Sequence, residues 1–164
     1  MRVLTVRQPW AWAIMHGGKD VENRSRNIAG SYRGPVAIHA AQADAANAPD
    51  ALWLAAAVDH QTTVLREPGK SHARWQPRGV IIGVVDLVEV HEWIDDSQCS
   101  GFEGADGEAT CSTWGMANHH HLVLANPRSF APIPAKGRLG LWKPSDDLAE
   151  RIASATTDPN GARP

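Results

Sequence analysis

Hydrophobic and polar residues alternate along several short stretches of this chain, as they do in β-strands that bury one face. Six stretches have this character: residues 2–6, 19–24, 36–40, 79–90, 120–125 and 138–142. The fourth contains the apolar run Val80-Ile81-Ile82-Gly83-Val84-Val85, which predicts a central strand buried on both faces, with a bulge at Gly83. The pattern therefore predicts a fold rich in short strands.

Helical signals are fewer and lie between these strands. Residues 9–16 predict a short helix, because Pro9 suits a first helical turn and Gly17-Gly18 suits a left-handed C-cap. The alanine-rich stretch 50–60 predicts a second helix, and Ser145 caps a third over residues 146–154. Without βαβ alternation, this order of elements predicts an α+β fold, a small mixed β-barrel of five or six strands with two or three short flanking helices.

Turn and loop signals set the expected boundaries of these elements. Asn126-Pro127 predicts the end of the fifth strand, and the proline-rich residues 132–137 predict a link to the sixth. Residues 60–77 predict a polar loop, and residues 95–113 predict a long surface excursion outside the sheet. The expected organisation is one domain at residues 1–144, a C-terminal helix at 145–154 and a disordered tail at 155–164.

The composition fits one globular domain. The chain has 164 residues, of which 43% are apolar, and its formal charge of −2 excludes a general basic coat for indiscriminate nucleic-acid binding. The apolar run from Trp10 to Met15 is far shorter than the roughly 20 residues of a membrane span, and Arg7 and Lys19 flank it too closely for a secretory signal. We therefore expect a soluble, cytoplasmic protein with no membrane partner. Cys99 and Cys111 are expected to be reduced.

Charge is segregated along the chain. Residues 1–35 contain six basic and two acidic residues, and residues 122–143 contain four basic residues and no acidic one. Residues 86–108 contain eight acidic residues and neither lysine nor arginine. If the two basic blocks lie together, they form a cationic face that attracts nucleic acid, and the alternative is that these charges are simply solvated.

Three groups of motifs, in this order, resemble those of the ASCH domain family, named after activating signal cointegrator homology. The first comprises Val6-Arg7-Gln8-Pro9-Trp10-Ala11-Trp12 and His16-Gly17-Gly18-Lys19-Asp20-Val21-Glu22-Asn23-Arg24-Ser25, similar to the family's QPW turn and its G-x-K-x-x-E-x-R strand. The second comprises Arg33-Gly34-Pro35-Val36-Ala37-Ile38-His39-Ala40 and the later strand from Gly79 to Asp86. The third comprises Leu124-Ala125-Asn126-Pro127-Arg128, Pro134-Ala135-Lys136-Gly137 and Leu139-Gly140-Leu141-Trp142.

This resemblance implies a PUA-like β-barrel, a fold used for RNA recognition, with a cleft beside the strand that carries Lys19. Fold alone does not assign function. The family includes a bacterial amidohydrolase acting on N4-acetylcytidine, reported ribonucleases and coactivator domains that bind nucleic acid. This chain departs from the family at two positions. Arg26 stands where many relatives have an aromatic residue, and Glu22 stands where the amidohydrolase branch has a catalytic threonine.

Lys19 is the first candidate functional residue. A lysine at the edge of a cleft serves as a phosphate contact, a base or, once desolvated, a nucleophile, and the alternative is an ordinary surface lysine. On an extended strand Glu22 points to the opposite face from Lys19, so the two meet only if a bulge or twist intervenes. Glu22 and Arg24 share a face, where the arginine orients the carboxylate.

The start of the first predicted helix supplies further candidates. Arg7, Gln8 and Trp10 lie where exposed N–H groups favour an anion, and the Trp10 indole offers a face for base stacking. Core packing is the alternative for Trp10 and the expectation for Trp12. The expected ligand-binding residues are Arg7, Gln8, Trp10, Lys19, Glu22, Arg24 and Arg26. The expected catalytic residues, if the protein is an enzyme, are Lys19 and Glu22.

Neither a metal site nor a cofactor is expected. Zinc binds cysteine and histidine, and the chain offers Cys99, Cys111 and the run His119-His120-His121. The two cysteines are single and twelve positions apart, so they lack the paired C-x-x-C spacing of a zinc site. His39 is expected to be a hydrogen-bonded histidine of the core or rim. Trp114 is expected either to close over a ligand or to plug the core.

Two working hypotheses follow. The leading one is a binding module that holds RNA, another single-stranded nucleic acid or a modified nucleoside in a basic cleft at Lys19. The second is a small amidohydrolase acting on N4-acetylcytidine-type nucleosides, in which Lys19 activates water or attacks the acyl carbon while Glu22, Glu103 or Glu108 handles protons. A ribonuclease has less support, a purely structural interaction domain stays open, and the sequence does not fix the oligomeric state.

Overall fold

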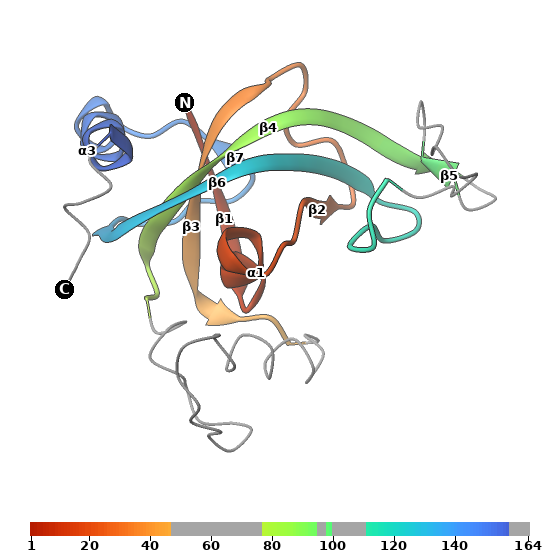
Figure 1. The fold of residues 1–164 in the computed structure, drawn as a ribbon, viewed down its shortest axis with the longest axis horizontal. Helices are drawn as coiled ribbons and strands as arrows, with labels where there is room; N and C mark the ends of the chain where they lie inside the picture. The colour runs from red at the N-terminus through yellow and green to blue at the C-terminus, as the bar shows by residue number, and fades with distance from the viewer. Residues whose placement is uncertain (47–76, 95–97, 100–110, 158–164) are drawn as a thin grey trace.

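A strongly curved mixed sheet forms the centre of the molecule (Figure 1). The structure is a computed structural model and describes residues 1–46, 77–94, 98–99 and 111–157. The strands are β1 (Arg2–Gln8), β2 (Val21–Arg24), β3 (Gly34–Asp44), β4 (Val80–Ile94), β5 (Gln98–Cys99), β6 (His120–Pro134) and β7 (Leu141–Trp142). The helices are α1 (Trp10–His16) and α3 (Asp146–Thr157). The predicted α+β class is confirmed.

The sheet is open, whereas the sequence predicted a barrel. Its strand order is β2-β6-β4-β3-β1-β7, and β5 pairs with β4 outside this path. β1 and β3 run parallel, and the other pairs are antiparallel. In the described part of the chain the two end strands do not pair with each other. β2 has four residues and β7 has two, which leaves too short a ladder to close the sheet.

β4 and β6 are the longest strands, with fifteen residues each, and they extend beyond the rest of the sheet toward β5 (Figure 1). The prediction that Asn126-Pro127 ends the strand is wrong, because β6 continues to Pro134. A register shift between β4 and β6, opposite Val84 and Asp86, accommodates Asn126 and Pro127 within the strand. Asn126 has a φ of 52°. The prolines at 132–134, predicted as part of a link, fit into β6 because β2 pairs only with residues 120–123 and leaves an open edge beyond them.

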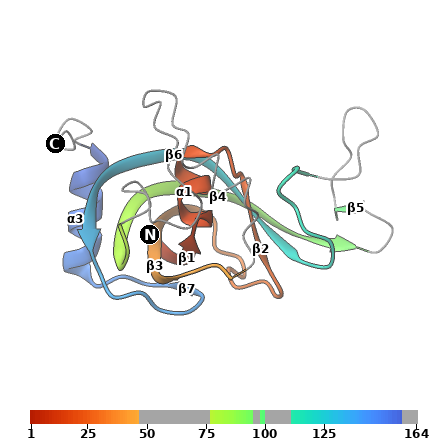
Figure 2. The same ribbon diagram turned by 90° about the horizontal axis from the view of Figure 1, so that it is seen from below.

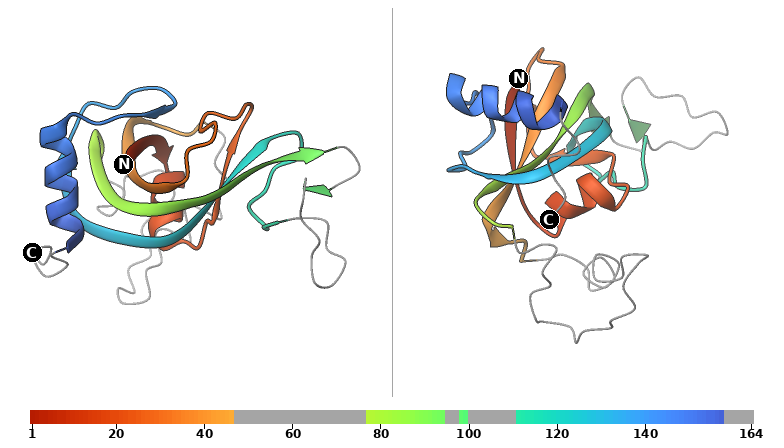
Figure 3. Two further views of the ribbon diagram at one scale, coloured as in Figure 1. Left: turned by 90° about the horizontal axis from the view of Figure 1, so that it is seen from above. Right: turned by 60° about the vertical axis from the view of Figure 1, so that its left-hand side comes forward.

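Two hydrophobic clusters occupy opposite faces of the sheet. One includes Leu4 and packs against Ile14 of α1. The other includes the neighbouring Val3 and packs against Leu148 and Ile152 of α3. Adjacent residues of β1 therefore serve different clusters, as the two-residue period of a strand requires. Figures 2 and 3 show the two helices at separate places on the curved sheet.

Both described helices lie close to their predicted positions. α1 ends at His16; its C-cap, Gly17, has a φ of −100°, and the left-handed residue is Gly18. The Ser145 hydroxyl caps α3 by accepting a hydrogen bond from the Leu148 amide at 3.3 Å. α3 continues to Thr157, so the first residues of the predicted tail are helical. Of the helices in the described residues, α1 has seven residues and α3 has twelve, and neither is long enough to cross a bilayer.

Several sequence predictions fall on parts of the chain that the structure does not describe. The predicted helix at residues 50–60, nearly all of the loop at 60–77 and the tail from 158 onward lie outside the described residues. The stretch 95–113 is described only in part. The prediction that this stretch lies outside the sheet is wrong at β5, because Cys99 pairs with Trp93 of β4.

Candidate functional site

Lys19 lies in the turn between α1 and β2 and is buried. Gly18 reverses the chain with a φ of 72°, and the Lys19 amide donates a hydrogen bond to the Ala13 carbonyl at 3.0 Å. Only 3% of the Lys19 side-chain surface is exposed, and its ammonium donates a hydrogen bond to the Val21 carbonyl. The backbone around the turn therefore draws the lysine into the protein instead of leaving it in solvent.

Two indole rings cover the Lys19 ammonium. Its Nζ lies 5.5 Å from the centre of the Trp10 ring and 5.7 Å from the centre of the Trp114 ring, within the range of a cation–π contact. The two rings meet edge to face, with centres 6.4 Å apart and planes at 90°. Trp10 comes from α1 and Trp114 from the segment before β6, so the fold unites residues that lie far apart in the sequence.

Glu22 joins Lys19 to Arg24. Glu22 Oε2 lies 3.7 Å from Lys19 Nζ, and Glu22 Oε1 lies 3.1 Å from an Arg24 nitrogen. Opposite faces were expected for Lys19 and Glu22, but they meet because Lys19 precedes β2 instead of lying in it. Burial lowers the pKa of Lys19, and the nearby carboxylates of Glu22 and Asp20 oppose that shift. Lys19 is thus an ammonium whose proton is held less firmly than that of an exposed lysine.

Arg24 also helps to hold the open sheet together. Its guanidinium donates a hydrogen bond to the Thr5 carbonyl at 3.2 Å. Thr5 lies on β1 just beyond Leu4, the last residue that pairs with β7. Arg24 therefore links β2 to β1 by a side chain where no strand pairing closes the gap.

Residues 111–119, here called the cap segment, hold Trp114 over the lysine. Asn23 of β2 binds the segment twice. Its Nδ2 donates to the Trp114 carbonyl at 2.8 Å, and its Oδ1 accepts from the Met116 amide at 2.9 Å. The Ser112 hydroxyl donates to Asp20. Sequence reasoning left two roles for Trp114, and this geometry makes it a cover over Lys19.

The other predicted ligand-binding residues form no ion pair with this group among the described residues. Gln8 is buried, and its Oε1 accepts a hydrogen bond from the Trp12 amide at 3.0 Å, so this oxygen satisfies the first turn of α1. Arg7 and Arg26 are exposed, and within the described chain neither forms an ion pair with Glu22. We call the contiguous group the Lys19 site; it consists of Trp10, Lys19, Glu22, Arg24 and Trp114.

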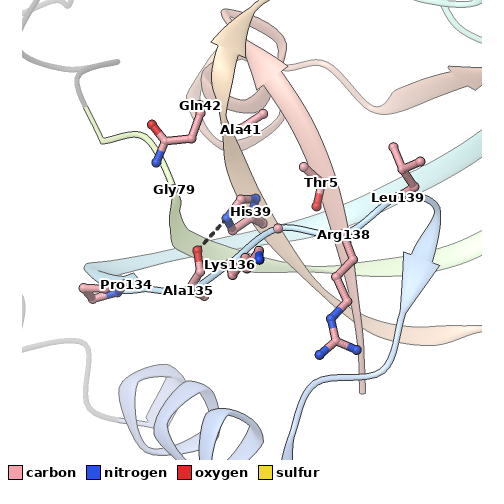
Figure 4. A pocket seen from close by; sticks show the side chains of 11 residues that line it. Thr5, His39, Ala41, Gln42, Gly79, Pro134, Ala135, Lys136, Arg138 and Leu139 are labelled. Atoms are coloured by element: carbon pink, nitrogen blue, oxygen red, sulfur yellow. Dashed lines mark hydrogen bonds between the residues drawn. The ribbon is translucent and has the colours of Figure 1, made fainter.

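The described residues form two hollows, and only the smaller one is lined by a residue of the Lys19 site. Lys19 lines a cavity of about 100 Å³ together with Ile14 and Leu124. This volume is below the roughly 300–1,000 Å³ of small-molecule sites. A larger groove of about 800 Å³ lies between β3 and the residues that follow β6 (Figure 4). Lys136 and Arg138 line this groove, and its described lining contains no acidic residue.

His39 lies on the groove wall, as Figure 4 shows. Its Nε2 donates to the Ala135 carbonyl at 3.0 Å, whereas its buried Nδ1 has no hydrogen-bond partner among the described residues, so the expectation of a satisfied histidine holds for only one ring nitrogen. Burial lowers the pKa of His39, which favours the neutral imidazole. Gly137 approaches the ring so closely that a Cβ there would lie 2.5 Å from His39 Cε1. Sequence analysis missed this groove, although the Lys136-Gly137 motif forms part of it.

One charge pair joins the C-terminal basic block to the acidic block across two strands. Arg128 of β6 lies 2.6 Å from Asp86 of β4, and the Asn126 amide donates to the same carboxylate at 3.0 Å. These hydrogen bonds lower the pKa of Asp86. Part of the C-terminal basic block is therefore neutralised by the acidic block.

A second group of reactive side chains lies at the β5 end of β4 and β6. It comprises His91, Cys99, Cys111 and His121, whose donor atoms lie within 4.8 Å of one another. These are the residues of the described chain that could hold a metal ion, although the sequence spacing argued against one. Burial and the adjacent Cys99 thiol raise the pKa of Cys111 to about 12.

Comparison with known proteins agrees with this architecture. A family model described as the ASCH domain matches residues 4–134. The crystal structure of ASCH from Zymomonas mobilis is similar to this chain, with a TM-score of 0.51 and 15% identity, over 94% of each chain. This likeness confirms the predicted α+β fold. Because the family model spans most of the sequence, the chain belongs to the ASCH domain family.

Proposed function

We propose that the chain binds a nucleobase at the Lys19 site, either in a modified nucleoside or in an unpaired RNA nucleotide. ASCH domains are generally nucleic-acid-binding, and PUA-like proteins often bind RNA. The observation that carries the proposal is the buried Lys19 ammonium between the indoles of Trp10 and Trp114. A cation beside aromatic rings complements a nucleobase, which has carbonyl acceptors at its edge and a face that stacks.

The charge balance favours a base over a phosphate. Lys19 and Arg24 are offset by Asp20 and Glu22, so the site lacks the surplus of cations that phosphate binding uses. Glu22 accepts hydrogen bonds and suits the amino group of a base, whereas Lys19 donates and suits a ring carbonyl. Binding of a free nucleoside should therefore depend only weakly on salt.

A nucleoside needs more room than the closed site offers, because the cavity at Lys19 measures about 100 Å³. Neither indole lines this cavity. In this proposal a base instead takes the place of the Trp114 indole beside Lys19 and Trp10, and the indole swings aside. Asn23 holds the Trp114 carbonyl and the Met116 amide, which are backbone groups. The indole can thus rotate without breaking the hydrogen bonds that hold its segment.

Calorimetric titration with cytidine, uridine, N4-acetylcytidine and a short single-stranded RNA, each at low and high salt, tests the proposal. We expect saturable nucleoside binding that is lost in Lys19→Met and retained in Lys143→Met, a matched change at an exposed lysine. Loss of base stacking of about 1–3 kcal/mol makes Trp10→Leu bind roughly 5- to 150-fold more weakly. Absence of binding by all four ligands refutes the proposal, as does binding that Lys19→Met leaves intact.

One observation favours a second function, hydrolysis of an N-acylated pyrimidine nucleoside. Burial lowers the pKa of Lys19, which raises the unprotonated fraction of an amine that can take a proton from water. In this scheme water adds to the acyl carbon, the amide C–N bond breaks, and the departing amino group receives the proton. N4-acetylcytidine would yield cytidine and acetate.

This second function lacks a feature of the amidohydrolase branch, because Glu22 stands at the position of its catalytic threonine. The other acids considered from the sequence, Glu103 and Glu108, lie outside the described residues. Incubation with N4-acetylcytidine followed by chromatography for cytidine is the test. Conversion that disappears in Lys19→Ala supports the enzyme, and no conversion, or equal conversion by this variant, removes it.

A further inference from the structure

We propose that His91, Cys99, Cys111 and His121 form a structural zinc site. They come from β4, β5, the cap segment and β6, and their donor atoms all lie within 4.8 Å of one another. Three of the four residues are buried, and Cys111 is half-buried. The cluster is separate from the residues that we propose to bind a base, so each proposal can fail without the other.

Strand pairing brings these ligands together, which sequence spacing could not show. His91 and His121 are register partners in the β4–β6 ladder, and their rings meet edge to face with centres 5.3 Å apart. Cys99 is opposite Trp93, which lies two residues from His91 and so on the same face of β4. The sulfurs of Cys99 and Cys111 then lie 3.5 and 3.1 Å from His121 Nδ1.

Hydrogen bonds leave one nitrogen of each histidine available as a ligand. His121 Nε2 donates to the Met116 carbonyl at 3.0 Å, so the lone pair is on Nδ1, the atom that faces both sulfurs. His91 Nδ1 donates to Glu89 at 3.3 Å, and its Nε2 is buried with no partner among the described residues. A carbonyl or carboxylate on the second nitrogen is the usual support of a zinc-bound histidine. A cation would also provide a partner for the buried His91 Nε2, and burying a polar atom without a partner destabilises the folded state.

The donor set selects zinc over the common hard cations. Two thiols and two imidazoles suit a tetrahedral zinc ion, whereas magnesium and calcium prefer oxygen ligands. Zinc bonds of about 2.0–2.3 Å place tetrahedral donor atoms roughly 3.3–3.8 Å apart. The sulfur–nitrogen distances of 3.1 and 3.5 Å are close to this range. Four protein ligands leave no open position, so the ion is structural and not catalytic.

The zinc site would anchor the cap segment on both sides of Trp114. Cys111 begins the segment, and the Met116 carbonyl is bound to the ligand His121. Gly115 packs directly against that histidine, since a Cβ there would lie 2.8 Å from His121 Cε1. The ion therefore fixes the backbone from which the Trp114 indole reaches Lys19.

Metal analysis of the full chain tests this proposal. The protein is purified under reducing conditions without chelator, incubated with zinc chloride and desalted. We expect an equimolar amount of zinc by mass spectrometry of the metal, and cobalt(II) substitution should give the intense visible absorption of tetrahedral thiolate coordination. Cys111→Ser and His91→Gln should lose both signals, whereas His119→Gln, which changes a neighbouring histidine outside the cluster, should keep them.

The wild-type protein decides the outcome even if a variant misfolds. A reduced wild-type chain that retains no zinc, or whose cobalt spectrum shows octahedral coordination without thiolate, overturns the proposal. A Cys99–Cys111 disulfide is the competing chemistry of two adjacent thiols. Mass analysis before and after reduction detects it, and a chain that forms this disulfide but binds no zinc after reduction also overturns the proposal.

Discussion

Replacing Trp114 with alanine should destabilise the protein moderately. The edge-to-face contact with Trp10 contributes about 0.5–1.5 kcal/mol, and the cation–π contact with Lys19 contributes about 0.5–2 kcal/mol. The backbone bonds of residue 114 to Asn23 and Ser112 survive, because they use its carbonyl and amide. The free energy of unfolding at neutral pH should therefore fall by about 1–3.5 kcal/mol, as measured by urea denaturation.

The same substitution should raise the pKa of Lys19 toward its ordinary value of 10.5, because it readmits water to the ammonium whose burial is the main cause of the lowered pKa. A lysine with a lowered pKa in the folded state gains stability as pH rises through that pKa toward 10.5, and this gain should shrink in Trp114→Ala. The chain has only four lysines, so NMR of the side-chain amines can follow Lys19, with Lys19→Met for assignment.

Trp142→Ala is the matched control. The Trp142 indole lies against Arg138, with 5.6 Å between the guanidinium carbon and the ring centre. Trp142 belongs to the hydrophobic cluster that packs against α3, on the face of the sheet opposite α1. This control should lose stability but leave the pKa of Lys19 unchanged. The reasoning is refuted if the pKa of Lys19 stays unchanged in Trp114→Ala, because the indole would then not shield the ammonium.

Three further predictions concern the groove, α3 and the charge pair between β4 and β6. Changing both Lys136 and Arg138 to glutamine should weaken binding of single-stranded RNA and reduce its salt slope by roughly one to two, while nucleoside binding at Lys19 is retained; fluorescence anisotropy at several salt concentrations measures this, and an unchanged slope excludes the groove. Ile152→Ala should lower the free energy of unfolding by about 2–5 kcal/mol because this side chain is fully buried, and a smaller loss in urea denaturation would contradict the docking of α3. Arg128→Gln should raise the pKa of Asp86 toward 3.8, and an NMR titration of the carboxyl group measures this change. The partly exposed pair stabilises the folded state by under about 1 kcal/mol. This stabilisation is present above pH 3.8 and is lost as the pH falls through the lowered pKa of Asp86. An Asp86 pKa that does not respond would show that the pair is not formed in solution.

Local sequence patterns correctly predicted the two described helices, because the ends of a short helix are determined by residues adjacent in the sequence. α1 follows from Pro9 and the two glycines that end it, and the start of α3 follows from the Ser145 cap. The course of β6 did not follow from local pattern. Asn126-Pro127 is a common turn signal, but here a register shift against β4 and a hydrogen bond to Asp86 absorb it. The competing strand pairing is a long-range interaction that a turn motif does not report.

The candidate site could be predicted only where its residues lie in one motif. Lys19, Glu22 and Arg24 are close in sequence, yet the contact between Lys19 and Glu22 required a turn at Gly18 that takes the lysine out of the strand. Trp114 reaches the lysine from a segment more than ninety positions away, held by Asn23. The position of Trp114 depends on the pairing of β2 with β6. The spacing of residues in a sequence motif does not reveal this pairing.

The cap segment also determines how the Lys19 site can open. Asn23 holds its backbone at Trp114 and Met116, and the proposed zinc site would hold it at Cys111 and, through His121, again at Met116. With its backbone fixed at both ends, the segment cannot lift away as a unit without breaking several of these bonds. The indole of Trp114 has no hydrogen bond among the described residues, and its ring contacts with Trp10 and Lys19 oppose rotation. Opening by side-chain rotation therefore costs less than moving the segment, so a base can enter beside Lys19 while the cap stays attached to the sheet.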